Sequence, residues 1–156
     1  HRHGPPMAPR RTERGRQMTS DVVVDTDVLS FLFKSDTRAD LYRPHLVGRR
    51  PVISFMTLAE LLRWPLANDW GAGRRRRLEL YVSRFVVHGY DEDLCRVWAE
   101  VTDAARRNGR VIQCADAWIA ATALLHHIPL VTHNRQDYLG VPGLQIIAEG
   151  PRGTET

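Results

Sequence analysis

The chain has 156 residues, of which 43% are hydrophobic and 26% charged, which is enough for one globular core but not for two. It contains no run of about eighteen apolar residues and no N-terminal signal pattern, so we expect a cytoplasmic protein rather than a membrane or secreted one. Its formal net charge of +4 lies in residues 1–18, because residues 19–156 hold seventeen basic and seventeen acidic side chains. The overall charge therefore gives no reason to expect a polyanionic partner.

The two ends of the chain differ in composition from its middle. Residues 1–18 contain several prolines, glycines and arginines but almost no apolar side chains, so they cannot bury enough surface to offset the entropy of ordering them. We expect a disordered basic tail there; the alternative for part of it is a remnant of an added tag or a stretch upstream of an alternative start at Met18. Residues 150–156 are a second tail, and residues 19–149 form the folded domain.

Strand and helix patterns alternate along this domain. In chain order they predict a strand at 21–26, a helix at 27–34, a broken helical stretch at 37–48, a strand at 51–55, a helix at 57–64, an arginine-rich helix at 73–83, a strand at 84–90, helices at 91–107 and 115–127, and strands at 129–133 and 144–148. Pro65 should end or kink the helix before it, and Asn108 with Gly109 should stop the long one. This alternation predicts an α/β fold with a parallel sheet covered on both faces.

The cysteines and the arginine clusters carry weaker signals. Cys95 and Cys114 have neither metal-ligand spacing nor the density of a disulfide scaffold, so we expect both to be small buried hydrophobes. The arginine clusters are candidates for contacts with a polyanion, although a solvated surface is the simpler explanation of each. They comprise Arg74 to Arg77, Arg49 with Arg50, and Arg106 and Arg107 with Arg110.

Acidic residues follow the first two expected strands. Asp25 and Asp27 lie at the end of the first strand, where ligands bind in an open parallel sheet, although either is equally well explained as a helix N-cap. Glu60 lies one turn into the helix after the next strand, hence at the same edge of the sheet. Thr57 and Glu60 also have the spacing of a capping box, in which the glutamate reaches back to an N-cap amide.

Two later segments add polar residues at the same edge. Asp116 stands at the front of a helix that is otherwise apolar nearly all round, and a carboxylate in such surroundings needs a partner or a cation. N-capping at the surface end is the alternative. The strand at 129–133 is followed by Asn134 and Asp137, with Thr132 nearby, and ordinary loop polarity is the alternative for these three.

All these positions share one geometry, because each follows an apolar strand or opens a helix at the carboxyl edge of the predicted sheet. Three or four oxygen ligands without a matching cluster of histidine and cysteine suit Mg²⁺ or Mn²⁺ rather than zinc. His126 and His127 adjoin each other on a helix without a ligand partner, and we interpret them as structural. Such a metal site predicts in-line hydrolysis of a phosphodiester by an activated water.

Four segments in this order resemble the acidic motifs of PIN-domain ribonucleases, particularly VapC-type toxins: VVVDTDVLSFLF, SFMTLAELL, CADAWIAATAL and LVTHNRQDY. The resemblance covers residues 21–148, and DAWIAATA followed by VTHN is its most specific part. It implies a three-layer α/β/α sandwich with a central parallel sheet of four to five strands, a site for Mg²⁺ or Mn²⁺, and RNA, often tRNA or rRNA, as the substrate. It also implies a homodimer that a small VapB-like antitoxin inhibits.

The resemblance also implies a role for each acid. Asp25 and Asp116 match the principal metal ligands, and Glu60 matches the third acid, with a share in positioning the water. Many relatives have an acid where this chain has Asn134, whereas here the aspartate comes three residues later, at Asp137. The fourth position and the number of metal ions therefore stay open. Asp27 stands where relatives often have asparagine, and we give it a supporting role.

Two other functions fit parts of the pattern. VVVDTDVLS loosely matches the first motif of haloacid-dehalogenase-like phosphatases, but their chemistry needs a downstream lysine, and the single lysine of this chain, Lys34, is too close to that motif. A non-catalytic PIN-like module that binds RNA or a protein is expected to lose acids, and Asp25, Glu60 and Asp116 are all present. The nuclease is the better interpretation.

Overall fold

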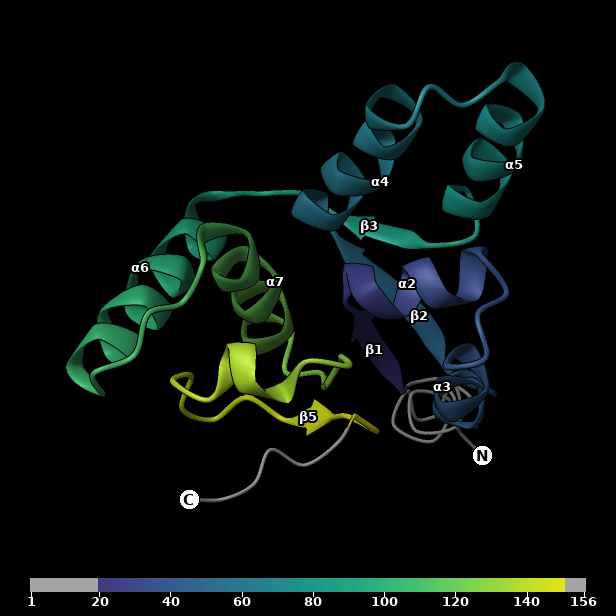
Figure 1. Cartoon of the computed structure of the whole chain (residues 1–156). Helices are drawn as coiled ribbons and strands as arrows, with labels where there is room; N and C mark the ends of the chain where they lie inside the picture. The colour runs from purple at the N-terminus through teal and green to yellow at the C-terminus, as the bar shows by residue number, and fades with distance from the viewer. Residues whose placement is uncertain (1–19, 151–156) are drawn as a thin grey trace, which may run out of the picture.

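In the computed structural model, which describes residues 20–150, five parallel strands form one sheet in the order β3-β2-β1-β4-β5 (Figure 1). The strands are β1 (Asp21–Val24), β2 (Arg50–Ser54), β3 (Val86–His88), β4 (Leu130–Val131) and β5 (Ile146–Ile147). The helices of this part of the chain are α2 (Thr26–Phe33), α3 (Ala39–Leu46), α4 (Phe55–Ala67), α5 (Ala72–Val82), α6 (Glu92–Arg107), α7 (Cys114–Leu125) and the 3₁₀ helix η1 (Arg135–Tyr138). The expected three-layer α/β/α sandwich with a parallel sheet is confirmed.

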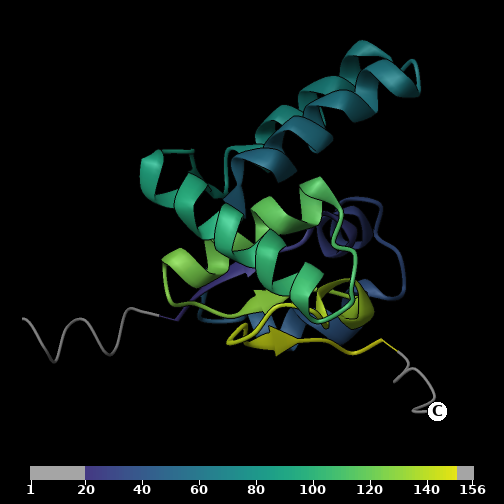
Figure 2. The same ribbon diagram turned by 90° about the vertical axis from the view of Figure 1, so that its left-hand side faces the viewer.

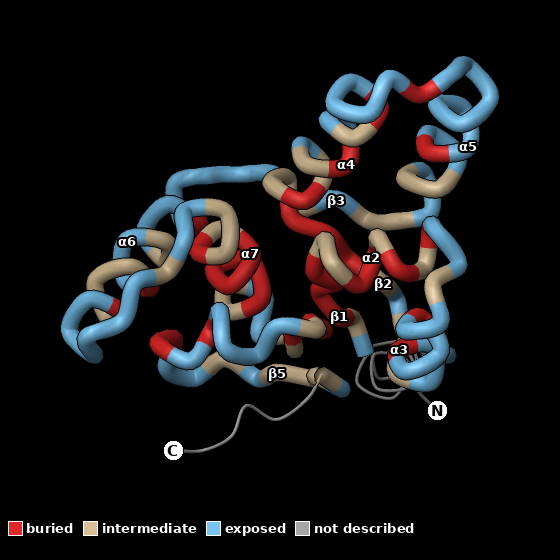
Figure 3. The backbone as a smooth tube through the Cα atoms, in the orientation of Figure 1, coloured by how far each residue is buried: buried red, intermediate tan, exposed pale blue. Residues whose placement is uncertain are grey.

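The two faces of the sheet carry different helices because neighbouring residues of a strand point to opposite sides. Val23 and Leu130 pack against α6 and α7. Val22, Val24 and Ile53 pack on the other side, against α2, α3 and α4. Figure 3 shows much of the buried backbone in β1 and β2 and in α7, the helix that packs on both strands. A strand buried on both faces explains the continuous apolar run that precedes Asp25.

Helices α4 and α5 form a hairpin that projects beyond the sheet (Figure 2). A small core of Phe33, Trp70 and Leu78 holds it to the end of α2. Two arginines of α5 act as structural donors: Arg75 Nε donates to the carbonyl of Trp70 at 2.8 Å, and Arg77 donates to the carbonyl of Phe33 at 3.2 Å. Part of the arginine cluster therefore stabilises the hairpin, while Arg74 to Arg77 all remain exposed, as expected of a solvated surface.

Of the two effects expected of Pro65, ending the helix is wrong, because α4 continues through Pro65 to Ala67, while a kink there stays a prediction. Pro65 lies in the last turn, where its missing N–H removes a single intrahelical hydrogen bond. Its ring is buried, and its carbonyl accepts a hydrogen bond from the Trp70 N–H at 3.0 Å. The buried ring and this hydrogen bond stabilise Pro65 inside the helix, where proline is otherwise unfavourable.

The expectation that both cysteines are buried is also wrong, since Cys95 and Cys114 are exposed. Cys95 lies beside the stripe of α6 that faces the core, which is marked by the buried residues Leu94, Val101 and Ala105. Cys114 is the first residue of α7 and stands at the loop that enters it. Position on the helix decides exposure here, and the general tendency of cysteine to be buried does not.

Some expectations concern segments outside residues 20–150. The basic tail at 1–18 and all of the C-terminal tail except Gly150 lie outside the described residues, so the domain boundaries stay predictions. Between Ser20 and Gly150, no helix is long and apolar enough to cross a membrane.

Candidate active site

Asp25 directly follows β1 and stands at the carboxyl edge of the sheet. It is the N-cap of α2, because its Oδ1 accepts the Thr26 N–H at 2.8 Å. Its Oδ2 accepts hydrogen bonds from Thr132 Oγ1 and from the Tyr138 hydroxyl, both at 2.8 Å. Only 7% of the residue is exposed. The two interpretations of Asp25 from the sequence are thus compatible, since one oxygen caps the helix and the other faces the site.

Asp116 is brought to the same place by α7. It is the third residue of that helix, and Gln113 occupies the N-cap position, so the alternative that Asp116 caps the helix is wrong. Its Oδ1 accepts a hydrogen bond from the Tyr138 hydroxyl at 3.4 Å. The buried phenol of Tyr138 therefore stands between the carboxylates of Asp25 and Asp116.

Glu60 reaches the site from α4. Ser54 caps this helix by accepting the Met56 N–H at 3.1 Å, so the alternative of a capping box between Thr57 and Glu60 is wrong. Glu60 Oε1 lies 3.2 Å from the hydroxyl oxygen of Thr26, which is itself 3.2 Å from Thr57 Oγ1. Since Thr26 follows Asp25 in the chain, its hydroxyl links the third acid to the first.

The remaining polar positions lie around Asp27. Asp27 Oδ2 accepts hydrogen bonds from the His133 N–H and from Asn134 Nδ2, both at 3.1 Å, while Oδ1 accepts the Val28 N–H at 2.7 Å. Asp137 lies in η1, is exposed, and is close enough for its charge to act on other acids of the cluster. Asn134 thus pairs with Asp27, whereas Asp137 contributes negative charge.

Burial and mutual repulsion raise the pKa values of the acids. Burial, followed by the charges of Asp25 and Asp137, raises the pKa of Asp116 to about 7. Burial and the charge of Asp25 raise the pKa of Asp27 to about 7. Burial also raises the pKa of Asp25 and of Glu60. The neighbouring charges that raise the pKa of these carboxyls come from other acids of the cluster, and the Arg38 guanidinium also lies within range of the Asp27 charge.

Such a cluster has the donor chemistry of a site for a hard cation. Carboxylate oxygens are the ligands that Mg²⁺ and Mn²⁺ prefer, and the crowded negative charge would be neutralised by such an ion. Within the described residues, no three His, Cys, Asp or Glu side chains are arranged to hold a metal ion as they stand. In this arrangement Oδ2 of Asp25 faces the hydroxyls of Thr132 and Tyr138. The donor types and their charge fit the cation, and Asp25, Glu60 and Asp116 are the residues that would hold it.

Sequence reasoning missed Tyr138 and Thr26, the two hydroxyl residues that connect the acids. Both are close in sequence to residues that it did select, Asp137 and Asp25, but no spacing rule indicates which hydroxyl points inward. His126 is exposed and stacks on the ring of His88 at a centroid distance of 3.9 Å, and its structural role stays a prediction.

Comparison with known proteins identifies the family of this chain. The profile of the PIN domain matches residues 22–139. A protein of Mycobacterium tuberculosis described as ribonuclease VapC4 is 33% identical over 127 residues, which cover 80% of this chain and 94% of that protein.

Solved structures give the same result. VapBC-1 from nontypeable Haemophilus influenzae matches with a TM-score of 0.71 and 27% identity over 82% of this chain and 97% of that one. VapBC-5 from Mycobacterium tuberculosis, described as a member of the VapBC family of toxin-antitoxin systems, matches with a TM-score of 0.61 and 25% identity over 83% of this chain and 99% of that one. The chain therefore belongs to the PIN-domain family and, within it, to the group of the VapC proteins.

Proposed function

We propose that this chain is a metal-dependent endoribonuclease that hydrolyses phosphodiester bonds of RNA, and that it is the toxin of a toxin-antitoxin pair. The observation that carries the proposal is the meeting of Asp25, Glu60 and Asp116, from three separate elements, around the hydroxyls of Tyr138 and Thr26. Membership of the PIN-domain family and the names of the similar proteins support it.

The acids have distinct roles in this proposal. Asp25 and Asp116 are the principal ligands of Mg²⁺, for which Mn²⁺ can substitute, and Glu60 is the third ligand. Asp137 is the better candidate for the fourth acid, because its charge acts on Asp25 and Asp116, whereas the Asn134 amide is hydrogen-bonded to Asp27. When bound, the cation supplies positive charge to the phosphodiester and lowers the pKa of a bound water.

The protein groups around the acids position them. Thr26 holds Oε1 of Glu60, and the other Glu60 oxygen accepts no hydrogen bond from residues 20–150, which leaves it available to orient the attacking water. Burial raises the pKa of Glu60, which makes this carboxylate a better proton acceptor than an exposed glutamate. Tyr138 holds the Asp25 carboxylate next to that of Asp116.

The test is RNA cleavage by the purified full chain. Mg²⁺ or Mn²⁺ should support cleavage of tRNA or rRNA, and excess chelator should stop it. Asp116→Asn should abolish cleavage while circular dichroism shows an intact fold. Asp103→Asn is the matched control, because Asp103 lies on α6 and pairs with Arg106 and Arg107. Full activity of Asp116→Asn, or activity in chelator, would refute the mechanism.

The partners follow from the same proposal. The chain acts in the cytoplasm as a homodimer, and a small VapB-like antitoxin inhibits it. Coexpression with the product of a small neighbouring gene should yield a stable complex and relieve growth arrest, and light scattering of the purified chain should give the mass of a dimer. A non-catalytic module would instead bind RNA without cleaving it in the assay described above.

The geometry does not favour the phosphatase alternative. Lys34 is the C-cap of α2, whereas Asp25 is the N-cap of the same helix, so the two lie at its opposite ends. The ammonium of Lys34 lies 5.8 Å from the centroid of the Trp64 ring. This lysine is thus placed against the hairpin rather than against the acids.

A further inference from the structure

The segment that follows β4 places hydrogen-bond donors on two of the acids. Thr132 Oγ1 donates to Asp25 Oδ2 at 2.8 Å, while the His133 N–H and Asn134 Nδ2 both donate to Asp27 Oδ2 at 3.1 Å. The Asn134 N–H in turn donates to Thr132 Oγ1 at 3.2 Å. A shift of this segment would therefore move the donors of both carboxylates together.

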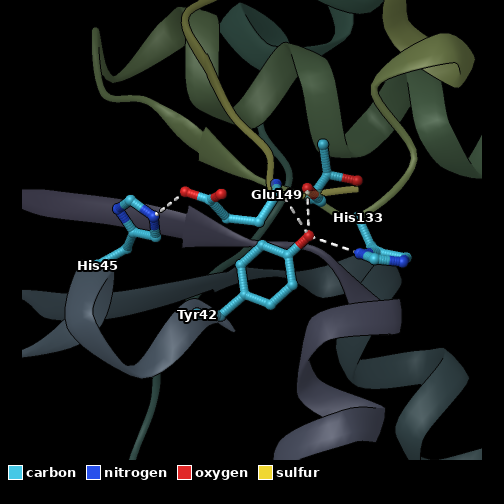
Figure 4. A network of polar contacts seen from close by, with 5 residues as sticks. Tyr42, His45, His133 and Glu149 are labelled. Carbon is cyan, nitrogen blue, oxygen red and sulfur yellow. Dashed lines mark hydrogen bonds and ion pairs between the residues drawn. The ribbon is translucent and has the colours of Figure 1, made fainter. Parts of the chain in front are cut away.

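The side chain of His133 anchors this segment to α3. Its Nδ1 lies 2.6 Å from the hydroxyl oxygen of Tyr42, a fully buried residue of α3 (Figure 4). The imidazole also makes edge contacts with the rings of Tyr42 and Phe31, at centroid distances of 5.7 and 5.1 Å. One short hydrogen bond and two aromatic contacts thus determine where His133 lies.

The end of the described chain, residues 148–150, packs against Tyr42 and His133, and we call it the C-terminal strap. The Glu149 N–H donates to the Tyr42 hydroxyl at 3.2 Å, and Glu149 Oε1 lies 2.7 Å from Nε2 of His45, also on α3 (Figure 4). A Cβ on Gly150 would stand 2.4 Å from the carbonyl oxygen of His133, a backbone atom that cannot easily give way. Only glycine lets the strap approach His133 this closely.

The hydrogen bonds around Tyr42 also favour one of the two tautomers of neutral His133. The Tyr42 hydroxyl accepts the Glu149 N–H and has a single proton to donate. Its nearer acceptor is His133 Nδ1 at 2.6 Å, compared with 3.4 Å to the Thr132 carbonyl. The shorter distance favours donation to Nδ1, and hence the tautomer of neutral His133 that carries its ring proton on Nε2.

We propose that Tyr42 and Gly150 are positioning residues: α3 and the C-terminal strap clamp His133 between them and thereby set the donors of Asp25 and Asp27. The inference rests on the proposed function for its kinetic consequence only. The clamp itself is a statement about structure, and a spectroscopic measurement can test it without any RNA.

The first measurement is the ¹⁵N spectrum of the full chain. In the wild-type protein, the two ring nitrogens of His133 should have the well-separated shifts of a single Nε2–H tautomer. Tyr42→Phe and Gly150→Ala should each bring these shifts towards the average of two tautomers and should move the amide signals of His133 and Asn134. Gly73→Ala is the matched control, because a Cβ there meets nothing within 4 Å. Unchanged His133 signals in both variants, or averaged shifts in the wild-type protein, would overturn the clamp.

The second measurement is steady-state RNA cleavage by the same proteins. Both variants should lose about 10- to 100-fold in kcat, the usual effect of removing a group that orients a site residue, while KM stays within about twofold. Altered His133 signals with an unchanged kcat would overturn the positioning role. Absence of cleavage by the wild-type protein would overturn the proposed function instead, and the ¹⁵N measurement would still decide whether the clamp exists.

Discussion

Replacing Asp116 by asparagine should stabilise the metal-free protein even though it removes the proposed activity. Folding raises the pKa of this carboxyl from its usual 3.8 to about 7, so the ionised form opposes folding. At 1.36 kcal/mol per pKa unit, the upper bound of this penalty at pH 7 is about 4 kcal/mol. Asp116 is only partly buried and water screens its charge, so we expect Asp116→Asn to raise the free energy of unfolding by about 1–2 kcal/mol.

The pH dependence follows from the direction of this shift. Because the folded protein holds the proton more tightly than the unfolded chain, the wild-type protein loses stability as the pH rises from about 4 to about 7. The gain of Asp116→Asn should therefore be greatest above pH 7 and should vanish near pH 4. Saturating Mg²⁺ should reverse the order of the two proteins, because the cation stabilises only the chain that binds it.

Urea unfolding in chelator, followed by circular dichroism between pH 4 and 8, measures these differences. Asp103→Asn is the control with the opposite sign, because the hydrogen bond from Arg106 lowers the pKa of Asp103 and the wild-type carboxylate therefore favours folding. If Asp116→Asn is no more stable than the wild-type protein at pH 7.5 in chelator, the acids are not crowded in the way described.

Three further changes test the parts around the acids. Tyr138→Phe should lower the free energy of unfolding in urea by about 1–3 kcal/mol, because it removes a hydrogen-bond donor from the buried Asp25 carboxylate. An unchanged free energy of unfolding would contradict the hydrogen bond from Tyr138 to Asp25. Replacing Arg74 and Arg76 by alanine should lower the free energy of unfolding by only about 0.5–1 kcal/mol, because the Arg74 guanidinium lies 4.0 Å from the centroid of the Trp70 ring. The same change should weaken RNA binding and lower its salt slope by about 1.4, the value for two phosphate contacts; an unchanged slope would assign these arginines to solubility or to partner binding. Replacing Arg75 and Arg77 should instead lower the midpoint of unfolding, because both donate to backbone carbonyls, and an effect on RNA binding alone would contradict that role.

Local pattern was sufficient to predict the layers of the fold. The run at 21–26 predicts a buried strand, and β1 occupies Asp21–Val24 with all three of its valines fully buried. The ends of elements were less predictable: 129–133 and 144–148 each contain only two residues in strand conformation. Strand length depends on the hydrogen bonds of the neighbouring strand, and β4 and β5 pair over two positions only.

The proposed site, like the fold, could be predicted from the sequence only in part. Asp25, Glu60 and Asp116 could be selected from the sequence because each follows a strand or opens a helix at one edge of a parallel sheet. Their assignment to a metal stays a prediction, whereas the structure decides which of them cap helices. Asp25 caps α2, whereas Ser54 and Gln113 take the cap positions that Thr57 and Asp116 could have taken.

The amino-acid sequence by itself determined the class of fold, the edge of the sheet where the acids stand, and the family. Only the tertiary structure decided which hydroxyls connect the acids and which residues hold the loops around them. Tyr138 lies 113 residues from Asp25, and His133 lies 91 residues from Tyr42. Periodicity reports what a residue faces within its own helix or strand, whereas a hydrogen bond across such separations depends on how the packed elements are placed relative to one another.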